Sequence, residues 1–303
     1  MISLRYHAVS IGAVFLALAL GVLLGASGVS DRLLSAVSTE RDDLDERVQT
    51  LTGERDDLAA AGRASDEFAR RVGPAAVRGL LPGQTVALVT AGADPADRDG
   101  VVALIEQAGA TVGGEVALTD AVGDPARADQ LRELTAGLLP SGAQLPAASD
   151  TGSLLGGLLG GALQPAIRSE QASAVLTGLT TAGFVRPGAV PAPSSLVLVL
   201  TGGMLTGVDA ADAAAVVTRL AVELDRGSSG AVLAGRTGSA DATGSVGVAR
   251  ADPTVTAALS TVDDVQTGSG QVSAVLTLRE QLDGRSGRYG TAATAADGAA
   301  PAA

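Results

Sequence analysis

The hydrophobic pattern of the chain opens with an unbroken apolar segment. From Ala8 to Ala26 the sequence AVSIGAVFLALALGVLLGA has Ser10 as its only polar side chain. About twenty apolar residues, each rising about 1.5 Å in a helix, are enough to cross the hydrocarbon core of a bilayer. Because unpaired backbone groups are costly in lipid, such a segment crosses as a helix. Residues 1–29 are therefore predicted to form a short cytoplasmic start and one transmembrane helix, a signal anchor.

Two details of this segment leave alternatives open. A cleaved signal peptide has an apolar region of about 7 to 15 residues that ends in small residues, and Gly25, Ala26 and Ser27 provide such an end. Gly21 and Gly25 have the GxxxG spacing that lets two membrane helices approach closely, although small residues also occur as filler in apolar helices. Arg5 precedes the segment and a long polar chain follows it, which predicts that the large domain lies on the extracytoplasmic side.

A heptad repeat follows over residues 30–73. The sequence ERDDL occurs at 40–44 and again at 54–58, a displacement of fourteen residues or two heptads. With Leu44 at position d, four successive d positions are apolar, which predicts a coiled coil between two copies of the chain. The d row is Val37, Leu44, Leu51 and Leu58, and the a row is Leu34, Arg41, Val48 and Arg55. The residues expected to mediate oligomerisation in the two helices are Gly21, Gly25, Val37, Leu44, Val48, Leu51 and Leu58.

The arginines limit the expected strength of this coiled coil. Arg41 and Arg55 would lie in the seam, where their stems can follow the apolar surface while their charges reach water. A dimer of limited strength is therefore predicted. The alternative, a single solvated helix, explains the charged residues but not the apolar d row. Gly73 and Pro74 form a helix stop, so a helix over residues 30–72 would extend about 60 Å.

Short apolar runs alternate with helical patterns over residues 74–290. Thr85–Thr90 (TVALVT) has the continuous apolar character of a buried parallel strand, and a helical pattern over Pro95–Ala108 and a second strand over Thr111–Thr119 follow it. Further helices are predicted over 124–139, 168–182, 209–224 and 270–282, with Asp124 and Asp209 as caps, and further strands over 196–200, 231–234 and 262–265. The predicted fold is α/β: the N-terminal transmembrane helix and the coiled coil, then a doubly wound, mostly parallel (Rossmann-like) sheet domain. Residues 291–303 are predicted to be a disordered tail.

Residues 141–163 are rich in Gly, Ser and Leu and end in the run SDTGSLLGGLLGGAL. One interpretation is a mobile lid or a hairpin that touches lipid, and the other is a helix that packs under the sheet. The run is too short to span a membrane. The packed helix is therefore the favoured interpretation.

Composition and charge exclude several classes of function. The chain of 303 residues has a net charge of −12, and all 21 of its basic residues are Arg. An acidic chain without a basic run or a set of stacking aromatic residues offers nucleic acid no binding surface. The sequence contains no Cys, which excludes disulfides and thiolate metal sites. Only 2% of the residues are aromatic, so Ala, Val, Leu and Ile have to build the core.

Groups for catalysis or ligand binding are few. His7 is the only His and precedes the transmembrane helix, so no Ser-His-Asp set can assemble in the folded domain. The absence of Lys excludes P-loop and Schiff-base chemistry, and we expect neither an enzyme nor a bound cofactor. Ligands of doubly wound sheets bind beyond the carboxyl ends of the strands, here Thr90–Asp94, Thr201–Met204 and Gly235–Ser239. Arg236 would be the charge partner of an anion there, although glycines at such positions are also ordinary turn residues.

Metal donors are also few, and the metal ligands stay unknown. Three aspartates near a predicted helix start offer oxygen ligands to a hard cation, but aspartates at such positions more often cap the helix. These are Asp94, Asp97 and Asp99. The acid pair at residues 263–264 is interpreted as solvated surface rather than as an acid/base pair. Tight copper sites use thiolate, thioether and imidazole ligands, for which the chain has only Met1, Met204 and His7.

The two ends of the sequence resemble a known family. The opening MISLRYHAVSIGAVFLALALGVLLG, followed by an acidic coiled coil, resembles the actinobacterial copper transporter family MctB, mycobacterial copper transport protein B. The segment STVDDVQTGSGQVSAVLTLREQLDGRSGRYG is similar to the closing segment of that family. The resemblance implies a membrane or cell-envelope protein of copper efflux and copper homeostasis, described in the family as pore-forming in the outer membrane. It identifies no site residues in this sequence.

The apolar runs differ from those expected of an outer-membrane pore. Such a pore is normally a barrel of alternating strands of about ten residues, whereas the runs here are short, continuous and separated by helices. Three functions therefore remain: an oligomeric envelope protein with copper ions as the transported species, a non-catalytic scaffold or adaptor that recruits partners, and a small-molecule binding domain.

Overall fold

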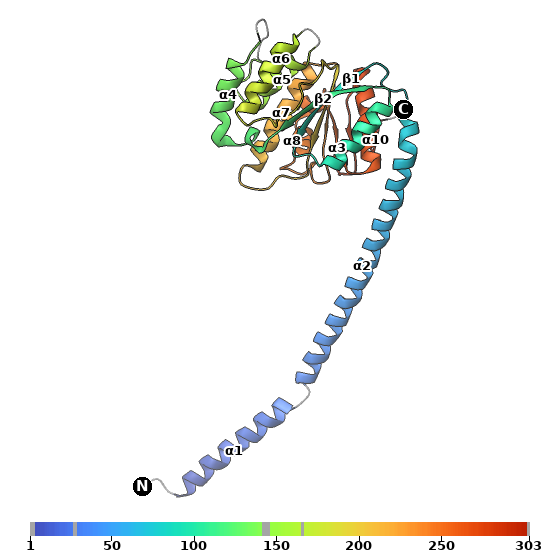
Figure 1. Ribbon diagram of the computed structural model, residues 1–303. Coiled ribbons are helices and arrows are strands. Elements are labelled where there is room, and N and C mark those ends of the chain that lie inside the picture. Colours follow the sequence, from blue (N-terminus) through green and yellow to red (C-terminus); the bar gives the residue numbers. More distant parts are fainter. Residues whose placement is uncertain (1–3, 27–28, 141–145, 165–166, 302–303) are drawn as a thin grey trace. The chain divides into compact units, whose positions relative to one another are not determined.

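The computed structural model describes residues 4–26, 29–140, 146–164 and 167–301 of the protein. Internal contacts divide the chain into two units, Met1–Arg63 and Ala64–Ala303. The first unit contains helix α1 (Leu4–Ala26) and most of helix α2 (Val29–Ala76), and the second contains the end of α2 and the α/β body (Figure 1).

Helix α1 has the length and composition of a membrane-spanning helix. Its segment Arg5–Gly25 is 21 residues long and has a mean hydropathy of 2.5, properties that a signal sequence near an N-terminus shares. A Cβ at Gly21 or Gly25 would meet no other atom within 4 Å, so a second helix has room to approach there. In the alternative cleavage region, Ser27 and Gly28 lie outside the described residues.

The end of helix α2 belongs to the α/β unit. The helix continues through the stop predicted at residues 73–74 and ends at Ala76. The carboxylate of Asp66 accepts a hydrogen bond from the amide of Gly268, the first residue of helix α10 (Gly268–Leu282). A Cβ at Gly73 would be 2.4 Å from a methyl carbon of Val272 in the same helix. The α/β unit therefore begins before residue 73, which is the boundary predicted from the sequence.

In the described residues, six strands form one sheet in the order β2-β1-β3-β4-β5-β6, and every neighbouring pair is parallel. The chain passes from β1 to β2 at one edge and then places β3 on the other side of β1. This winding in two directions confirms the predicted α/β class. The strands are β1 (Thr85–Ala91), β2 (Thr111–Leu118), β3 (Leu196–Thr201), β4 (Ala231–Ala234), β5 (Ser260–Val262) and β6 (Arg288–Tyr289).

Helices cover both faces of this sheet (Figure 1). Val86 and Leu88 of β1 face the layer of α3 (Pro95–Gln107) and α10. Ala87 and Val89 of the same strand face the opposite layer. Because both faces are buried, the strands have continuous apolar sequences rather than alternating ones. The opposite layer consists of α4 (Ala128–Gly137), α5 (Thr151–Leu163), α6 (Ser169–Thr181), α7 (Ala210–Arg226) and α8 (Ser245–Ala251).

Several predicted elements are present with different bounds. The helix predicted over 124–139 begins as a 3₁₀ turn, Pro125–Arg127, and continues as α4. The Asp124 carboxylate accepts a hydrogen bond from an amide of this turn, which confirms it as a cap. Asp209 precedes α7, but its side chain makes no capping hydrogen bond. The strand predicted over 262–265 is misplaced, because β5 ends at Val262 and the chain then turns toward α10. The sequence does not predict α8, helix α9 (Pro253–Thr256) or β6.

The C-terminal segment differs from the disordered tail that the sequence predicts. Residues 291–300 form turns next to β6. The Gly290 amide donates to the Gly298 carbonyl over 3.0 Å, and the Asp297 amide donates to the Arg288 carbonyl over 3.2 Å. Arg288 and Asp297 also form an ion pair, with 3.2 Å between Nε and Oδ2. These bonds attach the segment to the end of the sheet.

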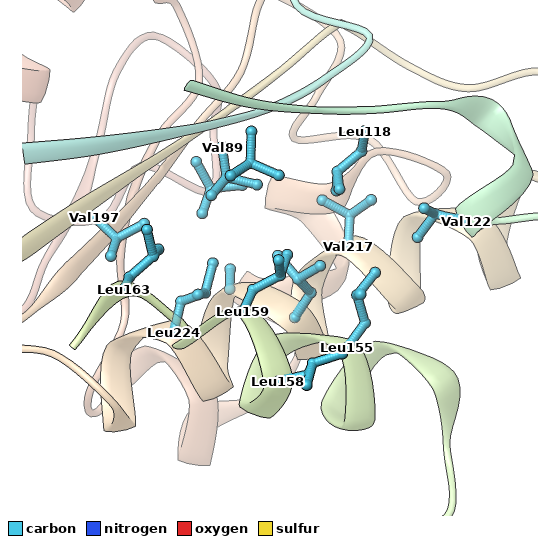
Figure 2. Packing of buried hydrophobic residues seen from close by; sticks show 14 of the residues in the cluster. Val89, Leu118, Val122, Leu155, Leu158, Leu159, Leu163, Val197, Val217 and Leu224 are labelled. Carbon is cyan, nitrogen blue, oxygen red and sulfur yellow. The ribbon is translucent and has the colours of Figure 1, made fainter. Parts of the chain in front are cut away.

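Helix α5 lies in the glycine-rich segment for which the sequence leaves two interpretations, and most of its residues are buried. Leu155 and Leu159 of α5 pack with Val217 and Leu224 of α7 in the core below the sheet, next to Val89 of β1 (Figure 2). The described part of the segment is therefore the packed helix, as favoured from the sequence. Residues 141–145 lie outside the described part of the chain.

Glycines allow α5 to lie very close to α7. A Cβ at Gly152 would be 2.3 Å from the carbonyl oxygen of Val216, and a Cβ at Gly156 would be 2.7 Å from that of Leu220. Atoms do not approach so closely without strain. The two helix backbones meet here because these positions carry no side chain.

This packing predicts opposite effects of one substitution at two positions of α5. Gly156→Ala is expected to lower the free energy of unfolding by about 1–3 kcal/mol, because the added methyl group forces the helices apart. At Gly161 a Cβ would meet no atom within 4 Å, so Gly161→Ala is expected to be neutral or to stabilise the protein by about 0.5–1 kcal/mol. Thermal and denaturant unfolding of both variants measures the difference, and equal effects would contradict the close packing.

Candidate functional site

The carboxyl ends of β1 and β3 border a cleft of about 430 Å³. The two strands are neighbours, and the strands that follow them in the chain, β2 and β4, lie on opposite sides of the pair. The cleft is therefore at the topological switch point, where doubly wound sheets bind ligands. It is lined by Gly92 after β1, by residues 201–203 at the end of β3 and by residues 207–210 at the start of α7.

The cleft has buried hydroxyl and apolar groups in its interior and exposed carboxylates at its rim. Thr201, Ser245 and Val217 are buried lining residues. The lining carboxylates, which are exposed, belong to Asp120, Asp124 and Asp209. None of the described residues that line the cleft is basic. A phosphate-bearing ligand would therefore lack a charge partner here.

The glycines at these strand ends serve the packing of the turns. Gly92 has a positive φ of 68°, which favours glycine. A Cβ at Gly202 would be 2.9 Å from the carbonyl oxygen of Gly92, and one at Gly203 would be 2.8 Å from that of Thr237. Close backbone contacts between neighbouring turns thus explain these glycines. The turn interpretation from the sequence is favoured over an anion site.

Arg236 donates a backbone hydrogen bond to the lining residue Gly202 over 3.2 Å but does not itself line the cleft, and its charge is already paired. Its guanidinium is 3.2 Å from Oδ2 of Asp94 and 2.8 Å from Oδ2 of Asp97. The second contact is an ion pair without the angle of a hydrogen bond. Burial raises the pKa of the Asp97 carboxyl, and the charge of Arg236 opposes this shift. Arg236 therefore stabilises a buried carboxylate, and its predicted role as partner of a bound anion is not supported.

The three aspartates considered as oxygen ligands of a cation serve in capping and ion pairing. Asp94 accepts a hydrogen bond from the Ala96 amide over 2.8 Å at the start of α3, and Asp99 forms an ion pair of 2.6 Å with Arg98. Within the described residues, no group of three or more His, Cys, Asp or Glu side chains is placed to hold a metal ion. The structure supports the capping interpretation for Asp94, whereas Asp97 and Asp99 form ion pairs with arginines.

The acid pair at the end of β5 is buried, so its interpretation as solvated surface is wrong. Asp263 and Asp264 are each 2% exposed. Asp263 forms an ion pair of 2.5 Å with Arg250, whose side chain is equally buried, and also accepts hydrogen bonds from the amides of residues 291 and 292. Arg250 in turn donates to the Tyr289 carbonyl over 2.7 Å. The sequence pattern gave no sign of this network, because Arg250 lies in a helix that it did not predict.

Asp264 has no comparable partner. Its Oδ1 atom is buried without a hydrogen bond, and Thr267 donates to Oδ2 only over 3.5 Å. Burial, and then the nearby charge of Asp263, raise the pKa of Asp264 from 3.8 to about 6. The carboxyl is therefore held in the fold at a cost in stability whenever it is ionised.

The predicted coiled-coil row is an exposed apolar stripe in the single chain. Val37, Leu44, Val48, Leu51 and Leu58 have exposed fractions between 54% and 74%. Exposed aliphatic residues in a regular stripe are a feature of surfaces that bind a partner. All five residues lie on helix α2.

Two further exposed apolar residues lie nearer the end of α2 and are missed by the sequence prediction. Val72 is 43% exposed and Phe68 is 67% exposed. Val72 occupies a d position, fourteen residues after Leu58, but Ser65 stands at the d position between them. Val72 thus fits the heptad repeat, but the polar Ser65 interrupts the apolar d row before it.

Comparison with known proteins identifies the family. A family model described as "Copper transport outer membrane protein, MctB" matches residues 1–300. The chain belongs to the MctB family. "Copper transporter MctB" of Mycobacterium tuberculosis (strain H37Rv) is 38% identical over 304 residues, which cover 96% of each chain. The protein of the same name from Mycobacterium bovis has the same values, and that of Mycobacterium leprae is 37% identical over 307 residues with the same coverage.

The MctB match extends over both helical segments and the α/β body, and it confirms the resemblance seen at the two ends of the sequence. Thioether and imidazole groups, which copper prefers, are few in the sequence. His7 lies in α1, Met204 is 53% exposed in the loop after β3, and Met1 lies outside the described residues. The described residues of the α/β unit thus offer copper one thioether and no imidazole.

The raised pKa of Asp264 predicts that removing its charge increases the stability of the protein in a pH-dependent way. Because the native state holds this proton more tightly than the unfolded chain, the native state loses stability as pH rises from about 4 to about 6, and the loss is constant above that range. Asp264→Asn is therefore expected to raise the free energy of unfolding of this MctB protein by about 2–3 kcal/mol near pH 7.5. The gain should vanish below about pH 4.

Unfolding by denaturant across this pH range measures the effect. Asp212→Asn is the control, since Asp212 is exposed on α7 and makes no ion pair in the described chain. Its difference from the unsubstituted protein should stay nearly constant between pH 5 and 8, to within about 0.5 kcal/mol. A pH-independent effect of Asp264→Asn would contradict the assigned pKa.

The pairing of Arg236 predicts a loss of stability when its charge is removed. Arg236→Ala leaves the Asp97 carboxylate buried without a partner and is expected to lower the free energy of unfolding by about 1–3 kcal/mol. Arg236→Ala combined with Asp97→Asn should recover most of this loss. Arg132→Ala breaks an exposed ion pair with Asp129 and should cost less than about 1 kcal/mol. Full stability of the single Arg236 variant would argue against this structural role.

Proposed function

We propose that this protein acts in copper transport in the cell envelope, as a membrane-anchored oligomer with copper ions as its transported species. The observation that carries the proposal is the match to the MctB family over residues 1–300. Relatives that cover 96% of the chain are named copper transporters. A match of this extent includes α1, α2 and the sheet, so it applies to the architecture as a whole.

The proposed anchor is α1. Its 21-residue apolar segment is long enough to span the hydrocarbon core, and Arg5 with the amino terminus precedes it. Under the proposal the helix is retained, the amino terminus is cytoplasmic and the α/β body is extracytoplasmic. This arrangement holds the body at one side of the membrane, where it can meet an envelope component or the transported ion.

The proposed oligomer forms through α2, and oligomerisation gives the anchored chain a means of building a transport path. A single membrane-spanning helix has no interior through which an ion could pass, because its backbone atoms are closely packed along the helix axis. The apolar stripe of Val37, Leu44, Val48, Leu51 and Leu58 is exposed in the single chain. Pairing of two such stripes would remove them from water.

A second candidate function is a scaffold or adaptor without a catalytic role. It is favoured by the same exposed stripe and by the small number of thioether and imidazole groups in the sequence. In this case the protein would recruit a partner in the envelope, and its effect on copper would be absent or indirect.

The copper content of cells tests the proposed function. Deletion of the gene is expected to raise cell copper several-fold, and the full chain should restore the original content. A chain that lacks residues 34–58 should restore it poorly, because the d and a rows are removed. A chain in which α1 is replaced by a cleavable signal peptide should also fail, because the body is released from the membrane.

Matched substitutions control for loss of folding. Leu44→Gln with Leu51→Gln should impair complementation, whereas Ala60→Gln with Thr50→Gln, outside the a and d rows, should not. Immunoblots of membrane fractions establish that all variants are present in equal amounts. Unchanged copper content after deletion, together with a defined partner recovered by the full chain, would replace the transport proposal with the adaptor.

A further inference from the structure

The repeated sequence ERDDL places a glutamate and an arginine next to each other at the edge of the seam on α2. With Leu44 and Leu58 at d, Glu40 and Glu54 occupy g positions, and Arg41 and Arg55 occupy the a positions that follow them. The same g-a pair thus occurs twice, two heptads apart. Position a lies in the seam and position g lies beside it.

These four charged side chains form few ion pairs within the described part of one chain. Arg41 is 3.9 Å from Asp45, with an arginine side chain that is 81% exposed. Among the described residues, Arg55 pairs only with its neighbour Asp56, at 2.7 Å. Neither Glu40 nor Glu54 forms an ion pair in the part of the chain that the structure describes. The two glutamates are therefore available to a partner that presents positive charge at the seam.

We propose that the partner is a second copy of this chain, parallel and in register, and that Glu40 and Glu54 of each copy pair with Arg41 and Arg55 of the other. This inference rests on the dimer of the proposed function and adds its orientation and register. In a parallel coiled coil the g residue of one helix flanks the following a residue of its partner. Two such pairs form at each of the two arginine layers, which gives four per dimer.

The order of apolar and charged layers favours this register. In register, Arg41 meets Arg41 and Arg55 meets Arg55, each beside a glutamate of the other chain, while Val48 meets Val48 in an intact apolar layer. A shift by one heptad would place the Val48 of each chain against an arginine of the other chain. An apolar layer would then be lost, and the arginine charges would lose their flanking glutamates.

An antiparallel pair is disfavoured by the same residues. Positions a and d meet each other in antiparallel coiled coils. Centred between Val48 and Leu51, such a pair would place Arg41 against Leu58 and Arg55 against Leu44. Four leucines would then contact guanidinium groups instead of leucines, whereas the parallel pair keeps all d layers apolar.

The absence of Cys from the sequence allows a direct test on the full chain in membranes. Leu51→Cys places a thiol at a d position, where two parallel, in-register copies bring the sulfurs within reach of a disulfide. Gly53→Cys places a thiol on the outer side of the same helix and should not crosslink. Mild oxidation followed by non-reducing electrophoresis gives the crosslinked fraction.

Charge exchange in the Leu51→Cys chain then tests the proposed pairs. Glu40→Arg with Glu54→Arg, or Arg41→Glu with Arg55→Glu, is expected to weaken self-association by about tenfold or more, because four pairs become repulsive. Co-expression of these two variants, distinguished by tags of different size, should restore the crosslink as a heterodimer. Glu46→Arg with Asp57→Arg changes the same number of charges at outer positions and should leave the homodimer unchanged.

The outcomes separate this inference from the proposed function. If the Leu51→Cys chain does not crosslink at all, the coiled-coil dimer of the proposed function fails, and the pairing fails with it. If it crosslinks but neither charge reversal weakens the dimer, the dimer stands and the proposed ion pairs are overturned. Loss of the homodimers with recovery of the mixed pair supports the inference, because misfolded variants would not recover one another.

Discussion

The α/β body depends on covering both faces of a parallel sheet with a core that contains almost no aromatic side chains. Aliphatic residues are smaller than aromatic ones, so the helices have to approach the sheet and one another closely to fill the interior at native density. The contact of α5 with α7 meets this requirement by leaving Gly152 and Gly156 without side chains against carbonyl oxygens of the other helix. The leucines of α5 then reach the core under β1 (Figure 2). The glycine content of the segment thus follows from packing.

A second constraint acts at the edge of the sheet, where β5 and β6 are short. Two or three residues provide few ladder hydrogen bonds, so side chains supply the rest. Arg250 reaches the carbonyl of Tyr289 and the carboxylate of Asp263, and Asp263 accepts hydrogen bonds from the backbone of the C-terminal segment. A buried ion pair with this many hydrogen bonds satisfies charges that would otherwise be costly in the interior. Asp264 does lower the stability of the fold when it is ionised, because its carboxyl is buried beside Asp263 with one long hydrogen bond and one unpaired oxygen.

The sequence predicts those parts of the fold whose signals are local. The apolar run of α1, the heptads of α2 and the continuous strands β1 and β3 follow from consecutive residues. Helix α9 and strand β6 have four and two residues, too few for a hydrophobic period to be recognised. The ion pair that stabilises buried Asp263 depends on Arg250, and the pairing of Arg236 depends on aspartates that follow another strand. Such partners are set by the order of strands in the sheet, which a local pattern does not contain.

The cleft at the switch point shows the same limit for function. Its position follows from the order of the strands, but its chemistry depends on loops from four parts of the chain. The sequence directed attention to Arg236 at the end of β4, whereas the cleft lies between β1 and β3 and is lined by acidic and hydroxyl side chains. Here the general rule for ligand sites in doubly wound sheets led to the strand ends that border the cleft, and the choice of residue from charge alone did not.

The proposed membrane anchor compensates for the limited strength of the proposed coiled coil. Two arginine layers weaken the seam of α2, so pairing of free helices in water would be modest. Helices that are tethered by α1 to one membrane are confined to a surface and share one orientation, which raises their effective concentration and removes the antiparallel alternative. Under these conditions a seam does not have to be strong, and the charges in it serve to select the register. A purely apolar seam would bind more tightly but would distinguish less well between alternative registers.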